Sequence, residues 1–159
     1  MEMTTDKMEF KDYQVDWLNQ FKDPNEPIVG LYGDRNSGRT TFGIGMVLSV
    51  MLSWVNSACV IIARNDNMKA HIKRLCLDFF CDIGLNLELN RNTKDDIGLS
   101  NGSRLFLVNQ NFYLSRLCGM SLDAAFMDCD LPFKEDAELR FTLKTRMKKN
   151  GKIIISRDL

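Results

Sequence analysis

The chain has 159 residues and a formal net charge of zero, from 21 basic and 21 acidic side chains. This length suits one domain with a proper core, and a composition of 45% hydrophobic and 26% charged residues is ordinary for a soluble globular protein. A protein that grips nucleic acid over most of its surface would be basic, so any DNA contact must be local or shared among subunits. We expect residues 1–9 to be disordered and residues 10–159 to form a single domain.

The cysteines predict buried, reduced thiols. They number five, lack C-x-x-C spacing and are accompanied by a single histidine, His71, which argues against a zinc site. The polar N-terminus does not resemble a signal peptide, and the longest apolar run, residues 42–55, is too short to span a bilayer. We therefore expect a cytoplasmic protein that is neither secreted nor bound to a membrane.

The first half of the chain predicts helices alternating with strands. Apolar residues three and four apart indicate an amphipathic helix over residues 10–21, which Pro24 and Pro27 end. A strand at 28–32 and a helix from about Thr40 to Val55 follow. Residues 58–63 form a continuous apolar run, typical of a strand covered on both faces. A second amphipathic helix is predicted over 67–82.

The second half predicts more strands and one charged helix. Residues 87–108 indicate short antiparallel strands, with a hairpin signal at Asn101-Gly102. A buried strand at 123–128, a helix at 132–149 and a last strand at 152–156 complete a parallel α/β sheet. Ligands of such sheets bind beyond the carboxyl ends of the strands, where Gly33, Asp128 and Ser156 are all expected.

A glycine-bounded loop between the first strand and its helix is the most informative motif. It matches the phosphate-binding loop G-x-x-x-x-G-K-S/T, except that Arg39 stands where lysine belongs. The backbone N–H groups of such a loop and the following helix N-terminus cradle phosphate oxygens, and the glycines let the backbone approach them. The candidate nucleotide-binding residues of the loop are Gly33, Asp34, Arg35, Asn36, Ser37, Gly38, Arg39, Thr40 and Thr41.

Two residues of this pattern are candidate ligands of Mg²⁺. Thr40 occupies the loop position whose hydroxyl holds the ion, and Asp128 ends an apolar strand as a Walker B aspartate does. The alternative for Asp128 is an ordinary turn-starting aspartate. Cys129 and Asp130 follow; a neutral thiol is a poor base for water, which leaves Asp130 as the nearby candidate carboxylate.

Six segments in order resemble the ATPase domain of the large terminase subunit, the motor that packages DNA in tailed phages and herpesviruses. Residues 10–18 resemble its opening helix, 35–41 its R-x-x-G-K-S/T-T loop, 61–64 the next strand, 101–105 an N-G-S hairpin, 117–123 the approach to Walker B, and 153–156 the coupling strand. The resemblance implies an α/β fold, a P-loop NTPase of the additional-strand type with a mostly parallel sheet and helices on both faces.

The resemblance also implies ligands, partners and location. ATP and Mg²⁺ would be the ligands, with Tyr13 and Gln14 near the adenine. Double-stranded DNA and a portal or other packaging protein would be the partners, in the cytoplasm of a bacterial host, and a homo-oligomer is compatible with this role. A terminase continues into a nuclease domain, for which this chain has no room, so we expect no DNA cleavage.

Two departures from the family pattern limit the expected chemistry. Lysine is a compact point charge whereas Arg39 presents a wide planar fork, and Cys129 stands where hydrolytic members have glutamate. Arg35, at a position where the family also has arginine, offers a second cation. Loss of one transition-state contact typically costs about a hundredfold or more in rate. We expect ATP binding with weak hydrolysis at most, with Arg39, Asp128, Asp130 and Arg35 as the candidate catalytic residues.

Three readings stay open on sequence alone. The first is a terminase-like motor ATPase, the second a non-hydrolysing relic that serves as an assembly or regulatory module, and the third a helicase-like ATPase, against which the lack of a clear D-E-x-H/D segment argues. Arg64 and Arg116 are either sensors or surface arginines. The basic run over residues 144–152 is either a DNA contact or a solvated face, and Phe112 and Tyr113 are expected to be exposed.

Overall fold

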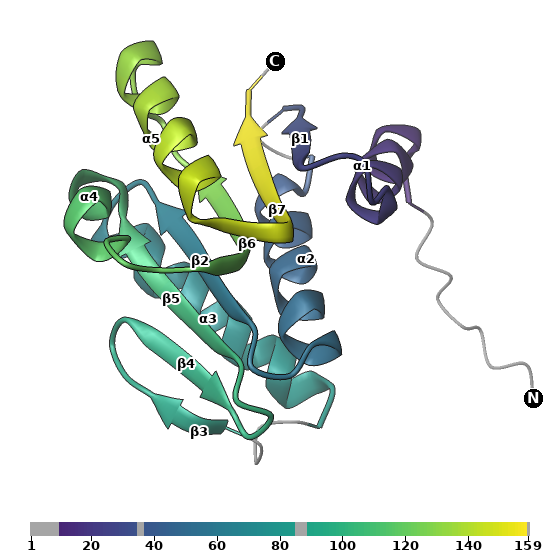
Figure 1. Ribbon diagram of the computed structural model, residues 1–159. Helices are drawn as coiled ribbons and strands as arrows, with labels where there is room; N and C mark the ends of the chain where they lie inside the picture. Colours follow the sequence, from purple (N-terminus) through teal and green to yellow (C-terminus); the bar gives the residue numbers. More distant parts are fainter. Residues whose placement is uncertain (1–9, 35–36, 85–88, 159) are drawn as a thin grey trace, which may run out of the picture.

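A computed structural model describes residues 10–34, 37–84 and 89–158 of the chain (Figure 1). The expectation of disorder over residues 1–9 lies outside the described residues, and so do the predicted site residues Arg35 and Asn36.

The described residues form a seven-stranded sheet in the order β1-β7-β6-β2-β5-β4-β3. Adjacent strands are parallel from β1 to β5, whereas β4 and β3 join the β5 edge in antiparallel pairing. The mostly parallel sheet that the sequence predicts is therefore confirmed. The strands are β1 Ile28–Tyr32, β2 Ala58–Ala63, β3 Leu89–Asn92, β4 Asp96–Leu99, β5 Arg104–Asn109, β6 Leu122–Asp128 and β7 Met147–Arg157.

Helices cover both faces of the sheet, as the apolar runs of its central strands require. Alternate residues of β2 point to opposite faces: Cys59 and Ile61 pack with α1, α2 and α3, whereas Val60 and Ile62 pack with α4 and α5. Figure 1 shows α2 and α3 on one side of the strands and α4 and α5 on the other. The helices are α1 Asp12–Lys22, α2 Arg39–Ser53, α3 Asp66–Asp82, α4 Tyr113–Arg116 and α5 Phe133–Arg146, with a 3₁₀ turn η2 at Gln110–Phe112. None of the helices within the described ranges is long and apolar enough to cross a membrane.

Close packing of α2 on β6 places the start of α2 beside the end of β6. A Cβ atom added to Gly43 would lie 2.2 Å from the ring of Phe126, a residue with no exposed surface. Because real Cβ contacts are longer than this, only glycine allows the helix to approach the strand so closely. The first turn of α2 therefore lies against the carboxyl end of β6.

Several boundaries differ from those the sequence predicts. The helix predicted to reach Lys149 ends at Arg146, and the last strand begins at Met147 rather than Lys152. The structure also has α4, which was not predicted, and this helix buries Tyr113, so the expected exposure is wrong for Tyr113 but confirmed for Phe112. The hairpin at Asn101-Gly102 is confirmed, with Gly102 at a positive φ of 86°.

All five cysteines are free thiols, and the prediction of burial is confirmed for Cys59 and Cys76 but wrong for two others. Cys81, in the last turn of α3, and Cys118, in the turn after α4, are exposed.

Candidate functional site

The loop of residues 33–41 joins β1 to α2 at the carboxyl edge of the parallel strands. The backbone N–H of Gly33 donates to the carbonyl of Arg157 at 3.2 Å, which ties the start of the loop to the end of β7. The N–H of Ser37 donates to the carbonyl of Asp34 at 3.0 Å. Gly38 then caps α2 with a φ of 84°, a conformation that favours glycine.

Two features of the described part of this loop are compatible with a cradle for an anion. A Cβ on Gly33 would lie 2.9 Å from the Ser37 Oγ, so glycine is needed to keep the concave side open. The Ser37 Oγ itself is buried and has no hydrogen-bond partner among the described residues. Because buried hydroxyls are normally paired, the atom is suited to bonding a ligand. The N-terminus of α2 adds unpaired backbone N–H groups and the positive end of the helix dipole.

Thr40 and Asp128, the two predicted Mg²⁺ ligands, lie side by side. The Thr40 hydroxyl donates to the Asp128 Oδ2 at 3.2 Å, although the two residues are 88 positions apart in the chain. Asp128 is 1% exposed, and its other oxygen lies 3.6 Å from the Arg64 Nη2. The Asp128 carboxylate therefore bridges Arg64, which follows β2, and Thr40 at the start of α2. Thr41, the next loop residue, is exposed in the first turn of α2.

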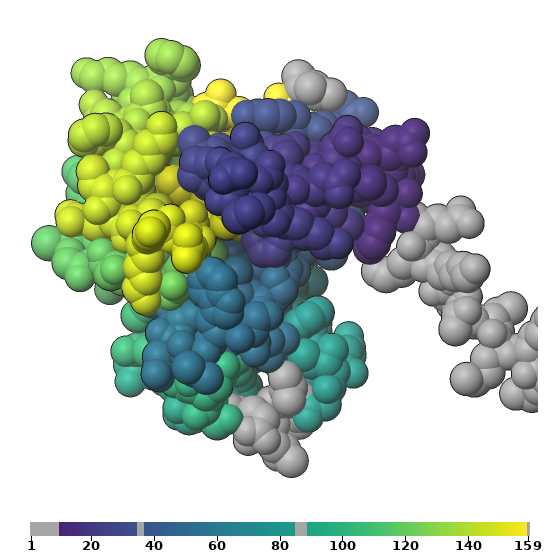
Figure 2. All heavy atoms as spheres, turned by 45° about the vertical axis from the view of Figure 1, so that its right-hand side comes forward, coloured from purple at the N-terminus to yellow at the C-terminus, as the bar shows by residue number. Residues whose placement is uncertain are grey.

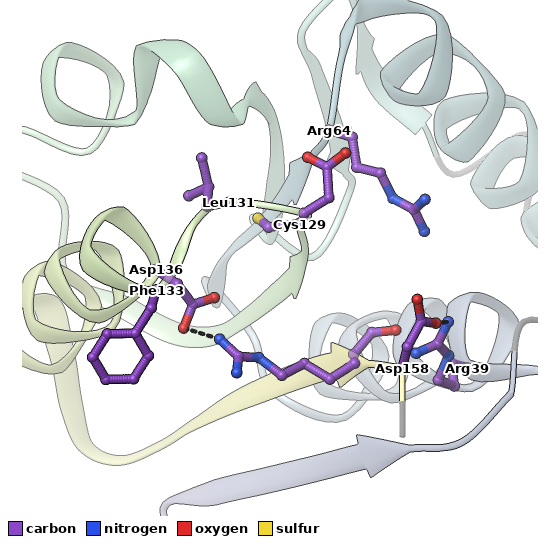
Figure 3. A pocket seen from close by; sticks show the side chains of 10 residues that line it. Arg39, Arg64, Cys129, Leu131, Phe133, Asp136 and Asp158 are labelled. Carbon is purple, nitrogen blue, oxygen red and sulfur yellow. Dashed lines mark hydrogen bonds and ion pairs between the residues drawn. The ribbon is translucent and has the colours of Figure 1, made fainter.

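Arg39 does not stand free in the loop but pairs with a carboxylate from the end of the chain. Its Nη2 lies 2.6 Å from the Asp158 Oδ1, with the arginine side chain 7% exposed and that of Asp158 65% exposed. Figure 3 shows the two side chains together just beyond the end of β7. The guanidinium is therefore already bound to an anion of the protein itself.

The residues after β6 give little support for activating water. The thiol of Cys129 lies 3.6 Å from the carbonyl oxygen of Ile62, and burial, followed by the nearby carboxylates of Asp128, Asp136 and Asp130, raises the pKa of Cys129 well above its ordinary value. The thiol therefore stays neutral at physiological pH. Asp130 is held by a side chain that the sequence analysis missed: its carboxylate accepts from the Gln110 Nε2 at 2.6 Å and its N–H donates to the Gln110 Oε1 at 3.2 Å.

A cavity of about 270 Å³ lies at this edge of the sheet (Figure 3). Asp136, at the start of α5, pairs within it with Arg157 and, at 2.8 Å, with Arg140. This bonding raises the pKa of Arg157 and fixes its side chain in the wall. The charged residues of the lining are Arg39, Arg64, Arg157, Asp130, Asp136 and Asp158. The three cations are matched by three carboxylates, so the lining has no net formal charge, and a polyanionic ligand would have to compete with these carboxylates for the arginines.

Tyr13 and Gln14 contact the loop itself. The Tyr13 hydroxyl donates to the carbonyl of Ser37 at 3.3 Å, and the Gln14 Nε2 donates to the same oxygen at 3.0 Å. Both side chains therefore lie beside Ser37 of the loop, and their expected place near the adenine stays a prediction.

The remaining cationic candidates are more peripheral. Arg116 is 62% exposed and lies 4.0 Å from Asp95, away from the loop. Two members of the basic run have structural partners: Lys148 pairs with Asp123 at 3.0 Å, and Lys152 donates to backbone carbonyls at the end of α1 and after it. Within the described residues no group of three or more His, Cys, Asp or Glu side chains could hold a metal ion.

Sequence reasoning missed Asp158 and Gln110, the partners of Arg39 and Asp130. Each directly follows a strand: Asp158 follows β7 and Gln110 follows β5. Position at the carboxyl edge was therefore the one signal that could have placed them near the loop.

The order of the strands defines the class of fold. β7 lies between β1, which carries the loop, and β6, which ends in Asp128. This inserted strand is the feature that separates additional-strand P-loop NTPases from those in which the two motif strands are neighbours. The chain has the P-loop NTPase fold of that type.

Comparison with solved structures places the fold among terminases. The chain is similar to the large terminase of the thermophilic bacteriophage D6E (TM-score 0.71, 9% identity, 93% of this chain and 39% of that chain). It is also similar to the large terminase of bacteriophage HK97 (TM-score 0.72, 16% identity, 94% of this chain and 33% of that chain). The third example is the large terminase ATPase domain of Thermus phage P74-26 (TM-score 0.61, 16% identity, 81% of this chain and 58% of that chain).

These likenesses confirm the resemblance seen in the sequence at the level of the fold. The chain spans between about a third and three-fifths of the length of these proteins. No protein-family model matches the sequence, and no curated protein does.

Proposed function

We propose that the chain is a terminase-like ATP-binding module of viral DNA packaging that binds ATP with Mg²⁺ and hydrolyses it weakly at most. The observation that carries the proposal is the contact between the Thr40 hydroxyl and the Asp128 carboxylate. It joins the loop to the Walker B strand in the arrangement that a Mg²⁺-nucleotide requires. The fold of the solved terminases supports the same assignment.

The residues present fit a nucleoside triphosphate with Mg²⁺. The open concave side of Gly33, the unpaired Ser37 Oγ and the N-terminus of α2 suit phosphate oxygens, and Thr40 with Asp128 would hold the ion. When bound, Mg²⁺ neutralises phosphate charge. Arg64 pairs with Asp128, and Arg39 supplies the cation of the loop once it is released from Asp158.

Turnover is harder to support than binding. Cys129 is neutral and cannot accept a proton from water, and the Asp130 carboxylate is engaged by Gln110. A missing base and a guanidinium in place of an ammonium would each lower the rate by about a hundredfold or more. This reasoning favours binding with slow hydrolysis.

A second candidate function follows from Arg39 and Cys129, the two departures from the family pattern. A module that binds no nucleotide, or holds it without turnover, would serve as an assembly or regulatory protein of a packaging machine. The Arg39–Asp158 ion pair favours this alternative because it satisfies the loop cation within the protein.

A thermal melt with and without Mg²⁺·ATP, Mg²⁺·ADP and a non-hydrolysable analogue tests binding. Ligand that binds only the folded state stabilises it by about 2.7 kcal/mol at a hundred times its dissociation constant. We expect a raised midpoint that needs Mg²⁺. An unchanged midpoint at millimolar nucleotide would sink the ATP-binding proposal and leave the assembly module.

Reversal of both departures tests the hydrolytic scaffold. We expect the double variant Arg39→Lys, Cys129→Glu to hydrolyse ATP at least a hundredfold faster than the natural chain. Each single variant serves as its control. Equal rates in all four proteins would show that the pocket no longer supports catalysis.

The remaining parts of the proposal concern the extent of the domain, its partners and its location in the cell. Residues 10–159 would act as one domain, with double-stranded DNA and a portal or other packaging protein as partners, in the cytoplasm of a bacterial host. The large terminases of D6E and HK97 support this setting through their fold. DNA-stimulated ATP turnover in the presence of a portal protein is the measurement that addresses it.

A further inference from the structure

A second cavity lies at the end of the sheet opposite to the phosphate loop. Its volume is about 440 Å³, against about 270 Å³ for the cavity beside the loop. Its lining includes Pro27, which precedes β1, and Asp123 at the start of β6, whereas the loop lies at the carboxyl ends of the parallel strands. Helix α2 runs from the loop to this cavity and has 15 residues, a length of about 22 Å. A small ligand in the cavity would therefore not touch the nucleotide site.

An irregular part of β7 forms one wall of this cavity. The pairing of β7 with β6 shifts register between Leu122 and Ala124, so that residues 148–151 of β7 face one residue of β6. A Cβ on Gly151 would lie 3.0 Å from the carbonyl oxygen of Leu122, so a larger residue would crowd the backbone here. β-Bulges are common beside functional sites, where they redirect side chains. This one places Lys149 in the wall of the cavity.

An aromatic side chain forms another wall. Trp54 follows the last residue of α2 and is 45% exposed. Its backbone is fixed on both sides: the N–H donates to the carbonyl of Val50 at 3.1 Å, and the carbonyl accepts the hydroxyl of Ser103 at 2.8 Å. The indole ring is therefore an exposed apolar surface on a fixed backbone.

Helix α1 and the segment after it supply a third wall. Phe21, in the last turn of α1, lines the cavity, as do Pro24 and Pro27. The helix is held on α2 by Trp17, whose ring packs edge-to-face on that of Phe42 with centroids 5.3 Å apart. Figure 2 shows yellow residues of β7 beside the dark blue segment between α1 and β1, with the lighter blue end of α2 below them. The walls therefore come from three parts of the chain that other contacts already hold in place.

The protein does not neutralise all the charged residues of this lining, which are Lys22, Lys149, Lys152, Glu26 and Asp123. Asp123 pairs with Lys148 at 3.0 Å. The Lys152 ammonium group bonds to the carbonyl of Glu26, and the negative charge of Glu26 acts on it. Lys22 and Lys149 are exposed, and neither has a hydrogen-bond or ion-pair partner within residues 10–34, 37–84 and 89–158. Two positive charges of the cavity are therefore unmatched by the described residues.

The unpaired charged and aromatic groups of the lining offer only donors. A lysine ammonium group has three N–H donors and no acceptor, and the indole of Trp54 has one N–H, which also lacks a partner among the described residues. A ligand that bonds to these groups must carry acceptor atoms, and the two lysines favour a negative charge. Sites for small molecules combine apolar walls with a few such polar groups. The lining therefore suits an anion with an apolar body.

We propose that this cavity is a second ligand site, which takes a small organic anion with a flat aromatic body. The body packs on Trp54 and Phe21, and the negative group pairs with Lys22 and Lys149. The cavity is separate from the phosphate loop, so the inference does not depend on the proposed function.

The test uses two fluorescent probes that differ in charge. Anilinonaphthalene sulfonate is a flat aromatic anion, and phenylnaphthylamine has the same rings without the sulfonate. Both are titrated into the natural chain, into Trp54→Ala and into the double variant Lys22→Met, Lys149→Met. Val55→Ala is the control for the tryptophan, because Val55 is 72% exposed and lies outside the lining. Lys134→Met, Lys144→Met is the control for the lysines, because it removes two exposed lysines of α5 outside the lining.

We expect the sulfonate to bind the natural chain at one site, at least threefold more tightly than the neutral probe. Trp54→Ala should weaken both probes by about fivefold or more, because it removes the aromatic contact. The double lysine variant should weaken only the sulfonate, by about threefold or more, the effect of exposed ion pairs. Both control variants should bind as the natural chain does, and saturating Mg²⁺·ATP should not displace either probe.

The opposite results are equally clear. Binding that does not saturate at one site per chain, or affinities unchanged in Trp54→Ala and in the double lysine variant, would overturn the inference. Equal affinity for the two probes would show that the site does not select an anion, and displacement by Mg²⁺·ATP would place the probe at the phosphate loop. The double lysine variant changes only exposed side chains, so it carries the test if Trp54→Ala does not fold. Failure of the chain to bind nucleotide would overturn the proposed function and leave this inference standing.

Discussion

At the scale of single residues, the contact between Arg39 and Asp158 sets how available the loop cation is. A phosphate oxygen and the Asp158 carboxylate compete for the same guanidinium, which is 7% exposed. We expect Asp158→Asn to strengthen Mg²⁺·ATP binding by about three- to tenfold because it removes the competitor. Calorimetric titration measures the change.

The matched control for this prediction is Asp158→Glu, which keeps the charge and should bind nucleotide as the natural chain does. Asp158 is 65% exposed, so the ion pair contributes little to stability, about 1 kcal/mol at most. Weaker binding by Asp158→Asn would show that the carboxylate orients Arg39 for the ligand and does not compete with it.

Two buried thiols make the stability of the protein sensitive to alkaline pH. Burial, aided at Cys59 by the charge of Asp123, raises the pKa of Cys59 and of Cys76 from 9.0 to about 12. The unfolded chain therefore releases these protons at lower pH than the folded chain. Their stabilising effect is complete below pH 9 and is lost as the pH rises from 9 toward 12.

We expect the loss to be about 1 kcal/mol for each thiol at pH 10, seen as a fall in the free energy of unfolding in urea. Cys76→Ala should be less stable at pH 7 but should lose less stability between pH 8 and pH 10 than the natural chain. Cys118→Ala, which changes an exposed cysteine, is the control. An identical pH dependence in Cys76→Ala would contradict the assignment.

At the scale of elements, the approach of α2 to β6 couples the stability of the fold to the site. In Gly43→Ala the new methyl group would meet the ring of Phe126 at 2.2 Å and push the helix from the strand. We expect a loss of about 1–3 kcal/mol in the free energy of unfolding, as for other overpacked cores. Because Thr40 and Asp128 lie at the ends of these two elements, Mg²⁺-dependent nucleotide binding should weaken as well.

Gly45 provides a matched control on the same helix. A Cβ at Gly45 would meet no atom within 4 Å, so Gly45→Ala should stabilise the protein by about 0.5–1 kcal/mol through helix propensity alone. Denaturant unfolding of both variants separates packing from propensity. Equal stability of the two variants would show that Phe126 yields to the new methyl group at no cost.

The elements differ in how well the sequence predicts them, for physical reasons. β2 is a continuous apolar run and β6 is apolar from Ala124 to Met127, because both faces of these strands are covered, and this pattern is visible in the residues alone. The first part of β7, by contrast, has polar, exposed side chains over residues 148–150 and pairs irregularly with β6. Irregular backbone pairing of this kind leaves no alternation of polar and apolar side chains in the sequence. The sequence therefore predicted that the helix starting at residue 132 continues to Lys149.

The same contrast applies to the site. Glycine spacing places Gly33, Gly38 and Thr40 in a loop, and the end of an apolar run places Asp128, so the sequence predicts these positions. Whether a cation in the loop is free depends on Asp158, which is 119 positions away along the chain. The pairing of two charged side chains far apart in the chain leaves no pattern in the nearby sequence. This pairing determines whether the Arg39 guanidinium is available to a ligand.

At the scale of the whole molecule, Lys152 joins the two ends of the described chain. Its ammonium group donates to the carbonyl of Gln20 in the last turn of α1, and to those of Asp23 and Glu26 in the segment between α1 and β1. Burial lowers the pKa of Lys152, as expected for an ammonium group that has left bulk water for backbone carbonyls. This contact fixes α1 to β7 and withdraws one cation from the basic run that was considered as a DNA contact.

We therefore expect Lys152→Met to destabilise the protein by about 1–3 kcal/mol, because it leaves three carbonyls without their charged donor. Lys149→Met, which changes an exposed lysine of the same strand, should have an effect within about 0.5 kcal/mol. The free energies of unfolding of both variants, from urea titration, make the comparison. If Lys149→Met weakens DNA binding while Lys152→Met only destabilises the fold, the basic run divides into one surface residue and one structural residue. Equal stability of the two variants would show that Lys152 does not hold α1 against the sheet, and that α1 depends on its aromatic contacts alone.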